Sequence, residues 1–302
     1  MKPLESFDLI TRPSEGRTKK PKYIIFSEGY VTEPCYFTAL RDHIRSKPSE
    51  VLADVVVMQR YMLQIGFSDP LKILELVSDY LHMLRTGEYS KALFVGKVVE
   101  SVMEANKGND LSEKELSDKI EAILKEKRYI DDNGNVRSYR AAASDVMEIL
   151  AADYHVNPVD TVQDDIEYDE DIDIICVVVD RDADSRLEEQ YRKFLARCDE
   201  NGYLAYVTNP RFELWLLLHH DIGEYMDAMK QPLKLKTTIR QLMDRFGIDG
   251  KDVDCTALIP KIPLAVEQVQ HLCTDLSGLE GNIGSNLGEL MMKLGVDKPF
   301  EQ

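Results

Sequence analysis

The stretch VVVDRDADS, residues 177–185, decides the fold, because a buried strand ends there in three closely spaced aspartates. A run of apolar β-branched residues bounded by charge is typical of a strand covered on both faces. At an effective dielectric of about 20, two carboxylates about 5 Å apart repel each other by roughly 3 kcal/mol. A divalent cation, nearby arginines or splaying of the side chains into water would offset that repulsion.

Strands and helices alternate on both sides of this stretch. KYIIFSEG, residues 22–29, predicts a buried strand that ends in Ser27, Glu28 and Gly29, and an amphipathic helix follows it. Such alternation predicts an α/β fold, a mostly parallel sheet with helices on both faces. The expected strands are 23–26, 54–59, 174–179 and 203–208, and the expected helices are 32–44, 68–84, 186–200 and 210–220, the last capped by Asn209 with Pro210 at its first position.

The rhythm changes between residues 85 and 168. Helical periodicity appears at 112–128 and 139–152, and ALFVGKVVESVM before them fits either a strand or a helix. We therefore predict an α/β core made of residues 21–84 and 169–302, with a helical C-terminal part. Residues 85–168 would form a mostly helical insertion with an acidic linker, which gates the site, recognises a trigger or is a solvated decoration.

The charge is uneven along the chain. The net charge of −17 disfavours nonspecific coating of nucleic acid, which depends on Lys and Arg. Residues 153–173 carry nine acids and no Lys or Arg, whereas 229–240 carry only basic charges, on Lys230, Lys234, Lys236 and Arg240. A basic face on an acidic protein is compatible with a nucleic-acid enzyme, although such a stretch is more often a solvated helix face.

Several features favour the cytoplasm. No window approaches 18 uninterrupted apolar residues, and the N-terminus lacks the apolar core of a signal peptide. The five cysteines share no metal-ligand spacing, which fits reduced thiols. We expect no membrane association.

The acids that follow two of the strands are the candidate chemical groups. In a parallel sheet, functional sites gather at the carboxyl ends of the strands, where Glu28, Asp180 and Asp182 would meet. Their oxygens suit Mg²⁺ or Mn²⁺, which could activate a nucleophile or stabilise a phosphoryl leaving group. The alternative is a solvated loop that caps the next helix, with Arg181 and Arg186 screening the acids.

Three motifs resemble the RloB-like family of bacterial defence loci. They are SEGYVTEPCYF at 27–37, VVVDRDAD at 177–184 and TNPRFELWLLLHH at 208–220, with a weaker match at NIGSNLGELMMKL, 282–294. The resemblance implies a Toprim-like, Rossmann-like core. By position it makes Glu28 a general acid or base and a metal ligand, makes Asp180 and Asp182 ligands of Mg²⁺, and gives Asp184 an assisting role.

Other residues have weaker signals. We predict that Arg181, Asn209, Lys234 and Lys236 bind the substrate. Glu33 would either cap a helix or belong to the site. Glu213 lies in an apolar helix and needs a partner, for which a backbone group or an arginine is favoured over a metal. His219 and His220 near the end of that helix are further candidates.

The function that follows is a metal-dependent Toprim-type nuclease or phosphodiesterase that acts on DNA, RNA or tRNA. The resemblance implies a role in anti-phage defence by abortive infection, beside a partner ATPase. An alternative is a non-catalytic Toprim-like module that regulates or binds a phage protein. A DxD glycosyltransferase is a third interpretation, which leaves Glu28 and NPRFELW unexplained.

Overall fold

The computed structural model describes residues 20–29, 31–46, 53–58, 70–86, 89–105, 112–154, 168–181, 188–248 and 253–298. A five-stranded sheet lies at its centre, with the strand order β2-β1-β5-β6-β7. Strands β2, β1, β5 and β6 run parallel to one another, and β7 pairs antiparallel to β6 at the edge. The predicted α/β class with a mostly parallel sheet is thus confirmed. The strands are β1 (Lys22–Ser27), β2 (Asp54–Met58), β5 (Ile174–Asp180), β6 (Leu204–Asn209) and β7 (Gly284–Ser285).

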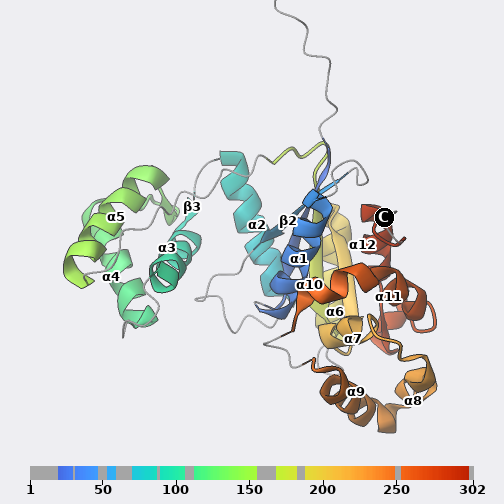
Figure 1. Ribbon diagram of the computed structural model, residues 1–302. Helices are drawn as coiled ribbons and strands as arrows, with labels where there is room; N and C mark the ends of the chain where they lie inside the picture. Colours follow the sequence, from blue (N-terminus) through green and yellow to red (C-terminus); the bar gives the residue numbers. More distant parts are fainter. Residues whose placement is uncertain are drawn as a thin grey trace, which may run out of the picture.

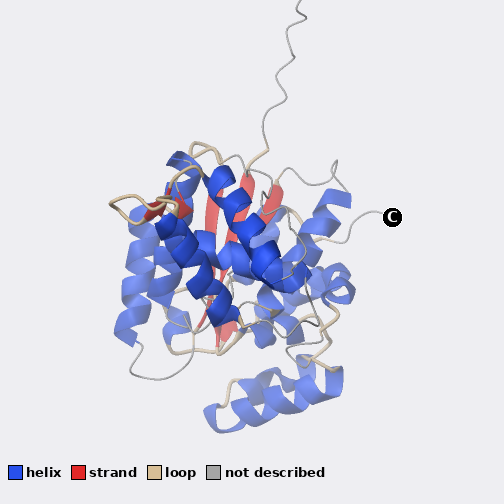
Figure 2. Cartoon of the chain, turned by 90° about the vertical axis from the view of Figure 1, so that its left-hand side faces the viewer, coloured by secondary structure: helices blue, strands red, loops and turns tan. Residues whose placement is uncertain are grey.

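Helices cover both faces of the sheet because alternate strand residues point to opposite sides. Ile25 and Val178 pack in one apolar cluster, while Ile24 and Val177 pack in another on the opposite face. Figure 1 shows α2 on one side of the strands and α11 and α12 on the other, and Figure 2 shows the strands between a front and a rear layer of helices. The first cluster includes α1 (Thr32–Ser46), α7 (Phe212–Leu217), α8 (Met226–Met229), α9 (Pro232–Phe246), α10 (Cys255–Leu258), α11 (Ile262–Val269) and α12 (Leu287–Leu294), and the second includes α2 (Pro70–Thr86) and α6 (Glu188–Asn201).

The region between α2 and β5 has an apolar cluster of its own. It is built by α3 (Lys91–Ala105), α4 (Glu113–Glu126) and α5 (Tyr139–Tyr154). The short strands β3 (Tyr89–Ser90) and β4 (Asn135–Val136) pair antiparallel in a small sheet of their own. These helices lie beyond α2, away from the sheet (Figure 1). The ambiguous segment ALFVGKVVESVM is therefore helical. The limits of an insertion at 85–168 stay a prediction, because Tyr89 packs against both this cluster and the one that α2 joins.

None of the helices in the described ranges is both long and apolar enough to cross a bilayer.

The edge strand β7 was not predicted, because a two-residue strand in the glycine-rich segment 278–286 has no periodicity to detect. Next to β7, the side chain of Asn286 forms the hydrogen bonds to β6 that the backbone of a longer edge strand would form. The side-chain Oδ1 of Asn286 accepts from the backbone N–H of Val207 at 2.6 Å, and its Nδ2 donates to the carbonyl of Ala205 at 2.9 Å. A side chain thereby satisfies two buried backbone groups at the edge of the sheet.

Replacing Asn286 with alanine is expected to destabilise the fold. Two buried backbone groups lose their partners, so the free energy of unfolding should fall by about 2–4 kcal/mol. Urea denaturation followed by circular dichroism measures this change. The matched control is Asn282→Ala, which removes one exposed side-chain bond to the carbonyl of Gly278 and should cost less than about 1 kcal/mol. Equal losses in the two variants would contradict this role for Asn286.

Candidate functional site

The ends of β1 and β5 bring Glu28 and Asp180 together. Ser27, the last residue of β1, pairs with Val178, and the backbone N–H of Glu28 continues the ladder by donating to the carbonyl of Val178 at 2.9 Å. The carboxylate of Glu28 then reaches past the end of the ladder, and its Oε2 accepts from the backbone N–H of Asp180 at 2.9 Å. Two acids separated by 152 positions thus lie side by side at the carboxyl end of the sheet.

The carboxylate of Asp180 in turn holds the beginning of α7. Its Oδ1 accepts from the backbone N–H of Phe212 at 2.9 Å, which satisfies one of the donors that a helix leaves free at its N-terminus. We predicted that Asn209 caps this helix and that Pro210 is its first residue, and this is wrong. The helix begins at Phe212, its N-cap residue Arg211 makes no side-chain cap bond, and an aspartate from another strand supplies an acceptor instead.

Asn209 is engaged elsewhere. Its Nδ2 donates to the carbonyls of Leu279 and Asn282 at 2.9 and 3.0 Å, so it fastens the end of β6 to the C-terminal loop. The side chain is buried. Its predicted contact with a substrate stays a prediction.

Glu33 in the first turn of α1 belongs to the same group of acids. The side chain is buried, and its Oε1 accepts from the backbone N–H of Gly29 at 3.0 Å. A Cβ atom at position 29 would lie 1.8 Å from Oε2 of Glu33, so only glycine lets the carboxylate approach the backbone this closely. The sequence signal for this role is an acid four residues after the glycine that follows the strand. The same signal fits a helix cap equally well.

The electrostatics at Asp180 show how crowded these acids are. Burial raises the pKa of Asp180 well above its ordinary value, and the charges of Glu33, Glu28 and Glu213 raise it further. The N–H of Phe212 opposes them and lowers the pKa. No basic side chain of the described residues is among the groups that shift this pKa. Three acids therefore act on Asp180 at a buried position where negative charge is costly.

These acids are hard oxygen donors of the kind that bind Mg²⁺ or Mn²⁺. Within the described ranges, no three acidic, histidine or cysteine side chains lie close enough to hold a metal ion by themselves. Asp182 and Asp184 lie outside the described residues, so the predicted ligand set of Glu28, Asp180, Asp182 and Asp184 stays a prediction. The crowding around Asp180 fits a cation, since positive charge would relieve it.

The basic residues predicted to bind substrate lie in two places: Arg181 directly follows Asp180, and Lys234 and Lys236 belong to α9. Arg181 is buried, its backbone N–H donates to the carbonyl of Thr208 at 2.8 Å, and its guanidinium lies over the ring of Tyr191 at 5.1 Å. Lys234 and Lys236 are exposed on α9, which lies with α8 beyond α7 at the lower end of the molecule (Figure 1). The substrate-binding roles of all three residues stay predictions.

His219 is a structural residue. It is fully buried, its Nδ1 lies 2.9 Å from the carbonyl of Trp215, and its Nε2 lies 3.0 Å from the hydroxyl of Tyr36. A carbonyl can only accept, so Nδ1 donates, and in the neutral imidazole the other nitrogen, Nε2, accepts from the hydroxyl of Tyr36. Burial lowers the pKa of His219 to about 3, which agrees with this state.

Comparison with known proteins gives one match. A family model described as RloB-like protein matches residues 23–294, which is most of the chain. No curated protein and no solved structure matches it.

Asp180 both carries a negative charge and accepts a hydrogen bond from α7, so two substitutions at this position should differ in stability. Asp180→Asn removes the charge but keeps an oxygen for the N–H of Phe212, whereas Asp180→Ala removes both. Without metal at about pH 7, the asparagine variant should melt a few degrees above the wild type, and the alanine variant should melt below the asparagine variant.

The gain in Asp180→Asn should depend on pH. The folded protein raises the pKa of Asp180, so ionisation destabilises the folded state above the ordinary pKa of 3.8, and this penalty disappears as the pH falls to that value. Melting temperatures in EDTA between about pH 4 and pH 7 test this. A gain that stays constant over this range would contradict the raised pKa.

Proposed function

The chain belongs to the RloB-like family, and from this membership and the geometry of its acids we propose that it is a metal-dependent phosphodiesterase or nuclease with a Toprim-like core. The observation that carries the proposal is the pairing of Glu28 with Asp180 at the carboxyl ends of two adjacent parallel strands. A glutamate and an aspartate in these positions are the acids that such a site needs. Glu33 and Glu213 add negative charge around them.

Glu28 and Asp180, with Asp182, would hold a Mg²⁺ or Mn²⁺ ion, and Asp184 would assist them. When bound, the ion would lower the pKa of a water molecule and neutralise charge at the leaving oxygen. Glu28 would accept a proton from the attacking water or donate one to the leaving oxygen. The backbone N–H of Asp180 donates to Oε2 of Glu28 and orients the carboxylate for this transfer.

The main-chain contacts of Asp180 position the site. Its backbone N–H orients Glu28, and its carboxylate orients α7, so a change in one element is transmitted to the other. Glu33 is fixed by the N–H of Gly29, which directly follows Glu28 in the chain. Short-range bonds of this kind hold catalytic groups in place before a substrate arrives.

The substrate would be DNA, RNA or tRNA. The net charge of −17 works against phosphate binding over most of the surface, so contact would be confined to a basic region. On α9, the exposed Lys234, Lys236 and Arg240 offer such a region, with Lys230 just before the helix.

We place this activity in the cytoplasm, in anti-phage defence by abortive infection beside a partner ATPase.

Loss of the Asp180 charge should abolish cleavage. We expect purified protein with Mg²⁺ or Mn²⁺ to cut at least one member of a panel of DNA, RNA and tRNA, and Asp180→Asn to reduce the rate by at least about a hundredfold. The asparagine keeps the bond to Phe212, so the loss reports the charge and not the fold. The control is Asp199→Asn, an exposed aspartate of α6, which should cut as well as the wild type.

Full phage protection by the Asp180→Asn variant in cells, with no cleavage by the wild type, would overturn the proposal. The protein would then be a non-catalytic module that regulates or binds a phage protein.

Glu33 should also contribute to metal binding. Glu33→Gln retains an oxygen for the N–H of Gly29 but removes the charge that acts most strongly on Asp180. We expect the variant to fold and to need about ten times more Mn²⁺ for half-maximal cleavage. A metal requirement equal to that of the wild type would assign Glu33 to the structure of α1 alone.

A further inference from the structure

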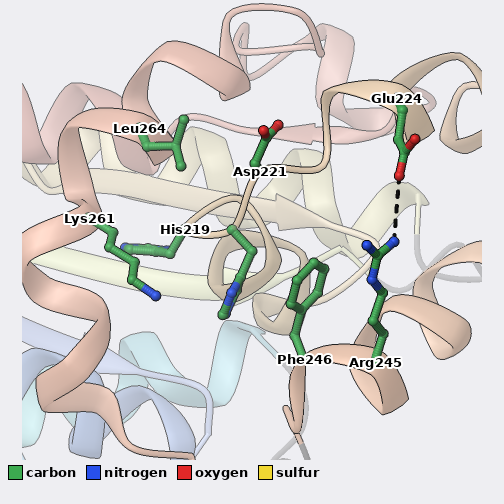
Figure 3. A pocket seen from close by; sticks show the side chains of 8 residues that line it. His219, Asp221, Glu224, Arg245, Phe246, Lys261 and Leu264 are labelled. Atoms are coloured by element: carbon green, nitrogen blue, oxygen red, sulfur yellow. Dashed lines mark hydrogen bonds and ion pairs between the residues drawn. The ribbon is translucent and has the colours of Figure 1, made fainter.

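A cavity of about 740 Å³ lies beside the end of α7, away from the acids of the candidate site. Its walls come from the residues after α7, from the end of α9 and from the segment that joins η4 (Ile259–Lys261) to α11. Figure 3 shows Lys261 and Arg245 on opposite sides of Phe246 around this space. The volume suits a small molecule or one unit of a polymer.

The backbone on one side of the cavity is rigidly held by Gln268. This buried side chain of α11 donates from Nε2 to the carbonyls of Leu218 and His220, both at 2.7 Å, and its Oε1 accepts from the N–H of Ile222 at 3.1 Å. Next to these contacts, His219 uses both of its ring nitrogens inside the protein. The cavity is therefore formed before any ligand arrives.

An aromatic pair forms part of the wall. The rings of His220 and Phe246 are stacked, with centroids 4.3 Å apart and planes inclined by 22°. Burial and the charge of Lys261 lower the pKa of His220, so the ring is neutral at pH 7. Both side chains are half-buried, and a neutral aromatic ring held in place by stacking is a surface on which a further planar ring can pack.

Two cations flank this pair. The guanidinium of Arg245 lies over the ring of Phe246 at 5.4 Å and donates to the hydroxyl of Tyr225 at 2.6 Å. Its carboxylate partner Glu224 is 3.5 Å away and exposed, so that pair is weak. Lys261 is exposed and forms no ion pair with any other residue that the structure describes.

The acids on the rim leave Lys261 available. Asp221 is exposed, and its Oδ1 lies 3.5 Å from the N–H of Gly223 within its own turn. The charge of Lys261 acts on both His219 and His220, whereas Asp221 is not among the groups that shift either imidazole. The charge of Lys261 thus acts on the aromatic wall.

We propose that this cavity binds a nucleotide, with the base against the side of the His220 ring that faces away from Phe246, and the phosphate at Lys261. A planar aromatic surface beside a cation that forms no ion pair with the described residues is the arrangement that recognises a base and its phosphate together. The nucleotide is either a free molecule or one unit of a single strand. This site goes beyond the proposed cleavage and does not depend on it.

Binding is tested with the full chain in EDTA, where metal-dependent cleavage is absent. The probes are adenosine 5′-monophosphate, adenosine, inorganic phosphate and a fluorescent single-stranded oligoadenylate, followed by calorimetry or fluorescence anisotropy. We expect the monophosphate to bind with a Kd below about 1 mM and at least about ten times more tightly than adenosine or phosphate. Lys261→Gln should weaken binding of the monophosphate about tenfold, because a charge-assisted contact is lost.

Two further variants complete the test. Phe246→Leu keeps an apolar side chain but removes the ring that holds His220 in place, and should weaken binding about tenfold. Lys114→Gln removes the same charge as Lys261→Gln from an exposed position on α4, on the other side of the molecule (Figure 1), and should leave binding unchanged. Circular dichroism confirms that each variant is folded, and the exposed Lys261 carries the test if Phe246→Leu does not fold.

The outcomes distinguish the two sources of the nucleotide. Tighter binding of the oligoadenylate than of the monophosphate, with both lost in Lys261→Gln, supports a unit of a strand. Binding of the monophosphate alone supports a free nucleotide. No binding of either probe, or binding that Lys261→Gln leaves unchanged, overturns the proposal while leaving the cleavage assay and its Asp180→Asn variant unaffected.

Discussion

The bonds of Asp180 are the constraint on which the site depends. Its backbone N–H holds Glu28, and its carboxylate holds the N–H of Phe212 at the beginning of α7, so one residue joins β1, β5 and α7. This contact forms in spite of the negative charges of Glu28, Glu33 and Glu213 around it. Positive charge next to these acids would relieve the repulsion, which is why we propose a cation there.

Much of this arrangement follows from the sequence. VVVDRDADS and KYIIFSEG each combine an apolar run with an acid directly after it, and parallel strands place their carboxyl ends at one edge. That logic predicted the approach of Glu28 to Asp180 from residues far apart in the chain. The prediction was correct because parallel strands place their carboxyl ends at one edge of the sheet. This holds even where the predicted end of a strand is wrong by one or two residues.

The features that were wrongly predicted or missed depend on single tertiary contacts. Asn209 has the side chain of a helix cap, yet it fastens the C-terminal loop, and Asp180 supplies the acceptor for α7. The antiparallel strand β7 and the pairing of Asn286 with β6 are likewise set by contacts across more than 70 positions. Local propensity contains no information on which distant group will satisfy a given N–H.

The short helix α7 connects the two regions of functional interest. Its six residues span about 9 Å, from the bond between Phe212 and Asp180 to the segment that carries His219 and His220 beside the cavity. Nearly all of its side chains are buried, so the helix is a rigid spacer between them. A strand bound at both regions would be held in a fixed register relative to the acids.

The proposed cation site of Glu28, Asp180 and Asp182 is tested most directly by a binding titration with Mn²⁺. Electron paramagnetic resonance of free Mn²⁺ in the presence of the protein counts the bound ions without requiring any substrate. The account predicts saturable binding to wild-type protein that is strongly weakened in Asp180→Asn, although that variant stays folded. Equal binding of Mn²⁺ by the two proteins, or no binding by the wild type, would contradict it.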